Sequence, residues 1–449
     1  MLRSFTVLGF SVLTFAMVLS CSKIDEGTDP KEKSSFDLMQ DKILTVSCAV
    51  SGCHLSEADG TFKQHGLVLA AGKSYANLVG VAPKNVNAVS DNLLRVKAFK
   101  SLESLLYHKL LFDNSHHAGK SYGSPMPLGM ELLSQGQIEF VRRWIEAGAP
   151  KTGNVVDASL LDDKTPSLAP FSALEVPAAG TGFQMRLEPF TVNPNFEREL
   201  FVRKAVGNTE TVYVNRFKIS MRPNSHHFIL YGFRNNTSLP QMNVIRDLRN
   251  PDNSLNLVTS IQMSNHVFYF GGSEQSIDYT FPAGTAVELA PNQTFDMNAH
   301  NFNKTDKPLT GEVYINLYTT PKSNVKNVVK VIDFGNQNIT LPPKTRTVVT
   351  KDFIFNTNVK IVTLFSHTHK LGEKFEILIK GGARNGEVVY TSTDWEHPLR
   401  KDLSPYISLK KGEGLTSRIT YNNTSSQTVR FGLTSEDEMG IIFGYYYEE

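Results

Sequence analysis

The chain has 449 residues, which is longer than one ordinary domain, so two or three separate cores joined by linkers are expected. Lysine and arginine number 46 and aspartate and glutamate 44, which leaves a formal charge of +2. This balance gives no electrostatic reason to expect a nucleic acid or an anionic membrane surface as a partner.

Residues 1–20 are predicted to be a targeting signal. Arg3 supplies a positive charge, and the apolar stretch Phe5–Leu19 that follows is too short for a membrane span. It ends in Val18-Leu19-Ser20-Cys21, which resembles a bacterial lipobox, so Cys21 is predicted to carry lipid. The lipid would anchor the chain in the bacterial cell envelope, facing the periplasm or the outside. An ordinary signal peptide with an incidental cysteine is the alternative. The polar residues 21–40 are predicted to form a tether.

The two remaining cysteines form the pattern Cys48-Ala49-Val50-Ser51-Gly52-Cys53-His54. Two thiols with a histidine directly after the second are what covalent haem attachment needs, because the thiols add to the vinyl groups and the imidazole meets the iron. Four residues separate the cysteines instead of the usual two, which weakens the motif. A local disulfide, with His54 as a bystander, is the alternative.

Residues 41–152 are predicted to form a small all-α domain. Its clearest helix follows Ser134, which suits an N-cap, and ends before Gly148 and Pro150. The apolar residues of this helix recur at helical spacing: Ile138, Val141, Trp144 and Ile145.

A Met-Pro loop at Met126-Pro127, followed by this helix, resembles the single-haem cytochromes of bacterial multidomain proteins. The resemblance implies a c-type haem bound to Cys48, Cys53 and His54, with Met126 as the second iron ligand. A thioether ligand raises the haem potential and suits electron transfer. Alternatives for the second ligand are Met130, His108, His116 and His117.

Residues 153–179 are rich in Asp, Pro, Ser, Ala and Gly and are predicted to be a linker. From about Phe183 onward the pattern changes to alternating strands separated by turn residues, as in Thr211–Ile219 and Val313–Tyr318. The fold class is therefore multidomain. Two all-β, jelly-roll-like sandwiches, residues 180–320 and 321–449, are predicted to follow the helical domain.

Five of the 12 histidines in the chain lie in three compact settings: His226-His227, His300 and His367-Thr368-His369. Residues two apart on a strand face the same side, so the last pair can present both imidazoles to one ion. Adjacent residues diverge on a regular strand and need a bulge or a strand end to converge. Taken singly, each setting also has an ordinary structural explanation.

Four segments in this order resemble the ascorbate-dependent type II copper monooxygenases, the family of the peptidylglycine α-hydroxylating and dopamine β-monooxygenases. The segments are Ser225–Phe233, Met297–Asn301, Ser366–Gly372 and Thr434–Met439. The resemblance covers residues 180–449. It implies two β-sandwich lobes, each with one copper ion, that face one another across an open, solvent-filled cleft.

The resemblance also implies the ligands of both ions. An electron-supplying copper would bind His226, His227 and His300. An oxygen-activating copper would bind His367, His369 and Met439. Imidazole suits both oxidation states of copper, and a thioether favours Cu(I), the form that meets dioxygen. The histidines that match no motif are expected to be structural: His65, His266 and His397.

The implied activity is hydroxylation, in which dioxygen provides one oxygen atom to a substrate C–H bond and two electrons are consumed. Ascorbate ordinarily delivers these electrons. Here the neighbouring haem motif leads to the hypothesis that an external donor, either an ascorbate-like reductant or a redox protein, passes electrons through the haem to the first copper. The alternatives are a haem and copper electron carrier or oxidase without hydroxylation, and a binding module that kept only the fold.

Two departures from the family concern the substrate. Phe365 stands two residues before His367, where the peptide-amidating enzyme has an arginine that holds the substrate carboxylate, and Gly440–Phe443 is mostly apolar. A glycine-extended peptide is therefore not expected, and the small molecule or peptide that serves as substrate stays unidentified. The family's disulfides are also absent, so packing must hold the lobes together.

Overall fold

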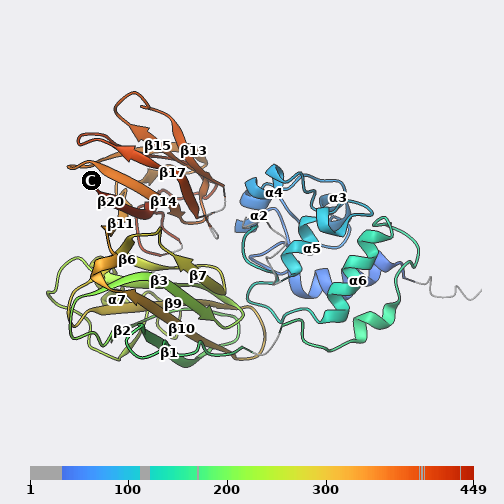
Figure 1. The fold of residues 1–449 in the computed structure, drawn as a ribbon. Coiled ribbons are helices and arrows are strands. Elements are labelled where there is room, and N and C mark those ends of the chain that lie inside the picture. The colour runs from blue at the N-terminus through green and yellow to red at the C-terminus, as the bar shows by residue number, and fades with distance from the viewer. Residues whose placement is uncertain are drawn as a thin grey trace, which may run out of the picture.

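The structure is a computed structural model that describes residues 33–111, 122–168, 171–393, 395, 398, 400–434 and 436–449. A helical region formed by the first part of the chain lies beside two β-sandwiches (Figure 1). Several sequence predictions fall outside the described residues: the signal 1–20, Cys21, His116, His117 and His397. Within the described part of the chain, no helix has the length and apolar character needed to cross a membrane.

The helical region is built from short helices around one core. They are α1 Ser35–Met39, the π-helix η1 Gln40–Cys48, α2 Gly60–His65, α3 Ser74–Leu78, α4 Val86–Ser90, η2 Ser101–Glu103, α5 Leu105–Leu110, α6 Gln135–Glu146 and η4 Ala158–Asp162. Trp144 of α6 is fully buried at the centre, where its ring lies 5.5 Å from that of Phe36. The indole N–H donates to the Pro150 carbonyl oxygen, 2.9 Å away.

The predicted helix after Ser134 is present as α6. Ser134 and Gln137 form a reciprocal capping box, which satisfies backbone N–H groups that the first turn leaves without partners. The helix ends before Gly148, whose φ of +97° is a left-handed conformation that glycine adopts without strain. Local sequence signals were therefore sufficient to place both ends of this helix.

The packed helical region is longer than the predicted limits 41–152. Phe36 and Met39, from the predicted tether, are buried in its core, and so are Val156 and Leu161, from the predicted linker. The Ser35 hydroxyl joins the two ends by accepting the backbone N–H groups of residues 155 and 156, at 2.8 and 3.1 Å. Isolated apolar residues in polar segments carry no periodic signal, which is why the sequence did not reveal this packing.

Two sandwiches of strands follow the helical region. The first contains β1 Gly182–Val192, β2 Phe196–Ala205, β3 Val212–Met221, β4 Ser225–Phe233, β5 Ile245–Asp247, α7 Leu257–Met263, β6 His266–Gly272, β7 Ser276–Thr280, β8 Thr285–Leu289, β9 Thr294–Asn303 and β10 Leu309–Thr320. The second contains η5 Lys322–Asn324, β11 Asn327–Gly335, β12 Thr340–Leu341, β13 Thr345–Ile354, β14 Val359–Thr368, β15 Gly372–Lys380, β16 Val388–Ser392, β17 Lys401–Leu409, β18 Gly414–Asn423, β19 Val429–Arg430 and β20 Gly440–Glu448. The prediction of a strand-rich second part of the chain is confirmed.

One sheet runs through both sandwiches. Its order is β1-β10-β3-β8-β11-β20-β14-β17, with β7 also paired to β3, and the parallel pair β8–β11 joins the two halves. The sheet β5-β2-β9-β4-β6 belongs to the first sandwich and β13-β18-β15-β16 to the second. The sequence predicts two lobes but not this shared sheet, because strand pairing across a lobe boundary leaves no local signal.

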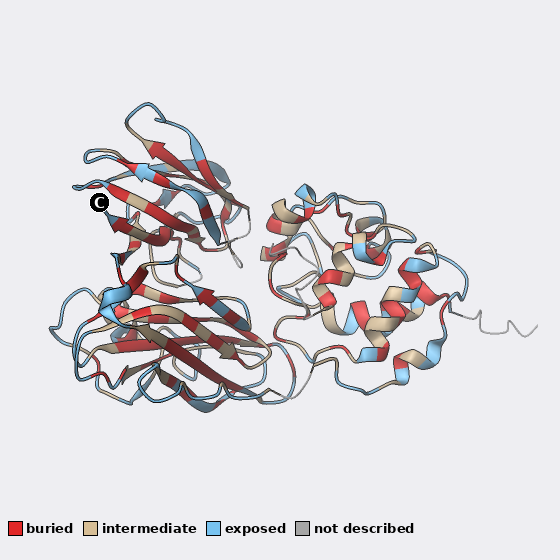
Figure 2. Ribbon diagram, in the orientation of Figure 1, coloured by how far each residue is buried: buried red, intermediate tan, exposed pale blue. Residues whose placement is uncertain are grey.

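Buried segments run along the strands of both sandwiches (Figure 2). Aromatic packing holds the two sandwiches together. Phe443 and Tyr445 of β20 belong to the same buried cluster as Phe268 of β6, and the Phe268 and Phe443 rings are 5.1 Å apart. The Tyr445 hydroxyl also donates to the Tyr269 carbonyl oxygen at 2.7 Å. A buried ring of this size contributes about 2–3 kcal/mol relative to its exposed state. The lobes, which contain no cysteine, are thus joined by a sheet and a common core.

Candidate metal centres

The first candidate centre lies where β4 and β9 pair. His226 and His227 are on β4, and His300 is on β9 directly opposite His227. The register shifts between Ser225 and His227, so a bulge lets both adjacent imidazoles turn toward His300. One nitrogen from each of the three rings lies within 4.8 Å of the others, which is close enough to hold one metal ion.

Hydrogen bonds determine which ring nitrogens face the metal position. Nε2 of His300 donates to Glu197 Oε1 at 2.8 Å, and Nε2 of His227 donates to Asn298 Oδ1 at 3.1 Å. The Asn298 amide in turn donates to Glu199 Oε1 at 3.0 Å. In both rings Nδ1 is left for a metal, and the Nδ1 atoms of His226 and His300 lie 3.2 Å apart.

Two carboxylates make the surroundings of this centre negative. Burial lowers the pKa of His300, but the charges of Glu199 and Glu197 outweigh burial, and the net pKa of His300 is raised. For Glu199 itself, burial dominates and raises the pKa of the carboxyl. Sequence reasoning missed both glutamates, since they lie on β2, far from any histidine motif.

The second candidate centre lies at the end of β14. His367 is on that strand and His369 follows it directly, with ring centroids 5.2 Å apart. Strand β20 pairs with β14 so that Gly440 lies opposite Thr368, which brings the preceding residue, Met439, to the same end. Met439 is 8% exposed, and His369 donates from Nδ1 to the Asp437 carbonyl oxygen at 3.0 Å. Nε2 of His369 is therefore the nitrogen left for a metal.

Glu438 forms hydrogen bonds with both segments that carry ligands of this centre, the one with His369 and the one with Met439. Its fully buried carboxylate accepts the backbone N–H groups of His369 at 3.1 Å, Leu371 at 2.6 Å and Met439 at 3.3 Å. Burial raises the pKa of Glu438 to about 8, although these three hydrogen bonds act in the opposite direction. The only sequence signal for this role was the position of a charged residue directly before Met439.

The imidazoles of the second centre are neutral at physiological pH. Burial lowers the pKa of His367 to about 3 and that of His369 to about 4. A neutral imidazole is the form that binds a metal, so protons do not compete for these rings until the solution is strongly acidic.

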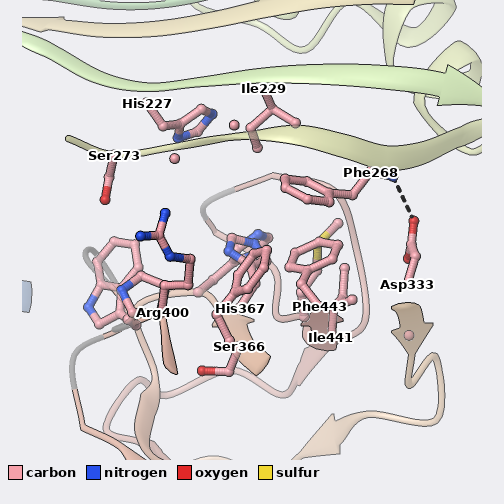
Figure 3. A pocket seen from close by; sticks show the side chains of 18 of the residues that line it. His227, Ile229, Phe268, Ser273, Asp333, Ser366, His367, Arg400, Ile441 and Phe443 are labelled. Atoms are coloured by element: carbon pink, nitrogen blue, oxygen red, sulfur yellow. Dashed lines mark hydrogen bonds between the residues drawn. The ribbon is translucent and has the colours of Figure 1, made fainter. Parts of the chain in front are cut away.

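Both centres line one cavity of about 1510 Å³. Figure 3 shows His227 on one wall and His367 on the other, with Phe268, Phe443 and Ile441 beside them. Asn87 and Ser124 of the helical region also line this cavity. The implied cleft between the lobes is thus present, and the helical region covers part of it.

Residues 328–449 match the family model described as the copper type II ascorbate-dependent monooxygenase, C-terminal domain. This match supports the copper type II monooxygenase family. It covers the segments of His367, His369 and Met439, while the first sandwich and the helical region lie outside it.

A search of curated proteins finds no match. Among solved structures, the chain is similar to one titled "Crystal Structure of the STIV MCP", with 8% identity, a TM-score of 0.28 and coverage of 60% of this chain and 97% of that one. The major capsid protein P2 from bacteriophage PM2 is 9% identical, with a TM-score of 0.23 and coverage of 59% and 98%. Likenesses this weak establish neither a shared fold nor a shared function.

Phe365, which stands in the place of the arginine in the peptide-amidating monooxygenase, is part of an aromatic wall. Its ring lies 5.2 Å from Phe268 and 5.4 Å from Phe443, and all three side chains line the cavity. His266, expected to be structural, also lines the cavity, and its Nε2 lies 2.8 Å from Asp296 Oδ2. The wall next to the second centre thus combines these three aromatic rings with polar residues such as Ser366 and Arg400 (Figure 3).

The predicted haem-attachment residues lie together in the helical region. Cys48 ends η1, and the chain turns back so that the His54 N–H donates to the Cys48 carbonyl oxygen at 3.3 Å. Cys48 and Cys53 are not joined by a disulfide, so the alternative of a local disulfide is not formed. Burial raises the pKa of the Cys48 thiol to about 12 and lowers the pKa of His54 to about 4.

The predicted second iron ligands have different surroundings. The N–H of Met126 donates to the Lys109 carbonyl oxygen at 2.6 Å, and the charge of Lys109 lowers the pKa of His54. His108 is held by a bond between Nε2 and the Leu102 carbonyl oxygen at 2.8 Å. His65, expected to be structural, has its ring 6.0 Å from that of His54. No motif signalled this neighbour, because chain folding brings it there.

Proposed function

We propose that this chain is a copper-dependent monooxygenase that hydroxylates a substrate C–H bond with dioxygen. The observation that carries the proposal is the convergence of two copper-type donor sets on one cavity. The first set has three imidazoles from β4 and β9. The second has two imidazoles and a thioether from β14 and the start of β20. The family match over residues 328–449 supports the assignment for the second set.

The donor chemistry of the two sets fits two different roles. Three imidazoles beside carboxylates suit an ion that changes between Cu(II) and Cu(I), whereas the thioether of Met439 favours Cu(I). Copper bound at both sites would supply one-electron storage and the activation of dioxygen. The chain itself orients the rings through Glu197 and Asn298 at the first centre and through the Asp437 carbonyl oxygen at the second, where Glu438 holds the backbone of His369.

The walls of the cavity suit an apolar substrate. Phe268, Phe365 and Phe443 lie at the second centre, where a C–H bond would have to be placed. Apolar rings bind by excluding water, and Arg400, which lies near His367 in Figure 3, adds a positive charge to the same cavity. The rings support a substrate whose reacting part is aliphatic or aromatic.

We also propose that the helical region carries a covalently attached haem, through which an external donor supplies electrons. Its ligands would be His54 and Met126, and its thioether links would form at Cys48 and Cys53. Two neighbouring cysteines that form no disulfide and a neutral, largely buried imidazole support this assignment. A lipid on Cys21 would anchor the protein in the bacterial cell envelope.

Metal analysis and an optical spectrum of the copper-loaded chain test the proposal. Two copper ions and one haem per chain are expected. His300→Ala and His369→Ala should each remove one copper ion, and copper contents unaffected by both changes would refute the assignment.

An assay with alkylbenzenes and labelled dioxygen then distinguishes hydroxylase from oxidase activity. Label in an organic product indicates hydroxylation, and label only in water or peroxide indicates an oxidase.

A further inference from the structure

The loop that contains Met126 is attached to the first sandwich on both sides of that residue. On one side the Ser124 hydroxyl donates to the Ser273 carbonyl oxygen at 3.2 Å. On the other side the Lys304 N–H donates to the Gly129 carbonyl oxygen at 2.8 Å. Lys304 directly follows β9, the strand of His300. The predicted iron-ligand loop is therefore held against the end of a strand that carries a first-centre histidine.

Phe302 lies between this loop and the first centre. Its ring centroid is 4.9 Å from that of His226 and 4.7 Å from that of His300. On the opposite side it meets Gly129, where an added Cβ would lie 3.1 Å from the Phe302 Cβ and 3.2 Å from its carbonyl oxygen. One side chain thus contacts two first-centre histidines while its backbone touches the loop.

Glycine is favoured at position 129 for two reasons. Its φ of +71° is strained for residues with a side chain, and an added Cβ would come closer to Phe302 than such contacts usually are, so that Phe302 would have to shift. The loop between Cys48 and Cys53 also approaches Lys304, because a Cβ at Gly52 would lie 4.0 Å from Lys304 Nζ. Both segments that would hold the haem therefore meet the chain just beyond His300.

We propose that Gly129, Phe302 and Lys304 form the contact through which the helical region delivers single electrons to the first metal centre, and not directly to the second. This inference rests on the proposed function. In the step, one electron passes from iron(II) to copper(II), giving iron(III) and copper(I), and no atom or proton is transferred. The side chain of Phe302 and the hydrogen bond from Lys304 act by positioning the two regions.

The full-length chain, loaded with copper and haem, tests the contact in a Gly129→Val variant. The haem is reduced by a flash-activated photoreductant without oxygen, and its reoxidation is followed by absorbance. The unaltered protein should show a fast phase that requires copper, and the variant should lose it with unchanged metal and haem contents. Phe302→Leu should slow the same phase. Gly153→Val is the matched control, because Gly153 has φ +88° but an added Cβ meets nothing within 4 Å.

Hydrogen exchange at the Lys304 amide gives a second readout that needs neither cofactor. Exchange should become faster in Gly129→Val and stay unchanged in Gly153→Val, since only the first change breaks the bond to residue 129. A fast phase that survives both Gly129→Val and Phe302→Leu would overturn the inference. A chain without haem would instead refute the haem proposal. In that case the contact could still be tested: an exchange rate at the Lys304 amide that is the same in Gly129→Val as in the unaltered protein would show that the contact is absent.

Discussion

The two candidate metal centres use the same side chain in opposite electrostatic settings. At the first centre, His300 is hydrogen-bonded to Glu197 and lies near Glu199, and its pKa is raised. At the second centre, burial lowers the pKa values of His367 and His369 to about 3 and about 4. Neighbouring carboxylates, and not burial, thus decide the direction of the shift.

This difference suits a division of labour between the centres. Negative surroundings stabilise the more highly charged Cu(II) ion, while a thioether ligand stabilises Cu(I). The first centre is therefore the better place to receive an electron and pass it on, and the second is the better place to meet dioxygen. Four predictions test this contrast, from the largest expected effect to the smallest.

Removing the thioether should abolish the oxygen chemistry of the second centre and leave the first intact. Met439→Ala is expected to eliminate copper-dependent dioxygen uptake, because Cu(I) loses its soft ligand there. An oxygen electrode and metal analysis measure the two effects. Met263→Ala is the control, since this methionine also lines the cavity but belongs to neither donor set. Uptake that persists in Met439→Ala would show that the thioether is not needed.

Glu438→Ala should strongly destabilise the second sandwich. Three backbone N–H groups would lose their acceptor in a buried site, which costs about 3 kcal/mol or more in total. Denaturant unfolding of the metal-free chain measures this loss. Glu436→Ala, two residues away and pairing only with Lys370 at the surface, should change stability little. Equal effects of the two changes would contradict the role assigned to Glu438.

Glu197→Gln should weaken Cu(II) binding at the first centre by about tenfold, because a partner that orients a ligand histidine tunes metal affinity by this order. The copper(II)/copper(I) potential should rise at the same time, since a negative charge is removed. Competition titration and a potentiometric titration measure the two quantities. Copper binding at the second centre should stay unchanged, and a comparable loss at both centres would indicate general misfolding.

The metal-free chain should respond to acid differently through the two centres. Burial lowers the pKa values of His367 and His369 from 6.5, so the unfolded chain binds protons at a pH where the folded chain does not. The free energy of unfolding therefore falls as the pH drops from 6.5 toward 4. The raised pKa of His300 acts in the opposite direction. Its contribution is fully present below 6.5 and is lost as the pH rises through the folded pKa.

Unfolding measured at about pH 7, 6 and 5 reveals these slopes, each at most about 1.4 kcal/mol per pH unit for one histidine. His367→Gln should flatten the loss of stability between about pH 6 and 5. His300→Gln should steepen the net loss between about pH 7 and 6 and leave the slope between pH 6 and 5 unchanged. The contrast between the centres would be wrong if both variants changed the slope in the same direction.

Features that depend on neighbours in sequence could be predicted. Helix α6 has its cap at Ser134 and its stop at Gly148, and both signals lie within the segment itself. His367 and His369 are two residues apart, so strand geometry alone brings their rings together. The side-chain alternation of a strand also predicted that His226 and His227 need a bulge or a strand end to converge, and the register shift between Ser225 and His227 shows that a bulge is present.

Features that depend on pairing between distant strands were decided only by the tertiary structure. Glu197 meets His300 across 103 residues, and Glu438 meets His369 across 69. The contact of Gly129 with Phe302 likewise joins separate regions of the chain. Residue spacing can nominate metal ligands because ligand chemistry is limited to few side chains. The groups that orient and charge those ligands are set by sheet register and domain packing, which no local pattern encodes.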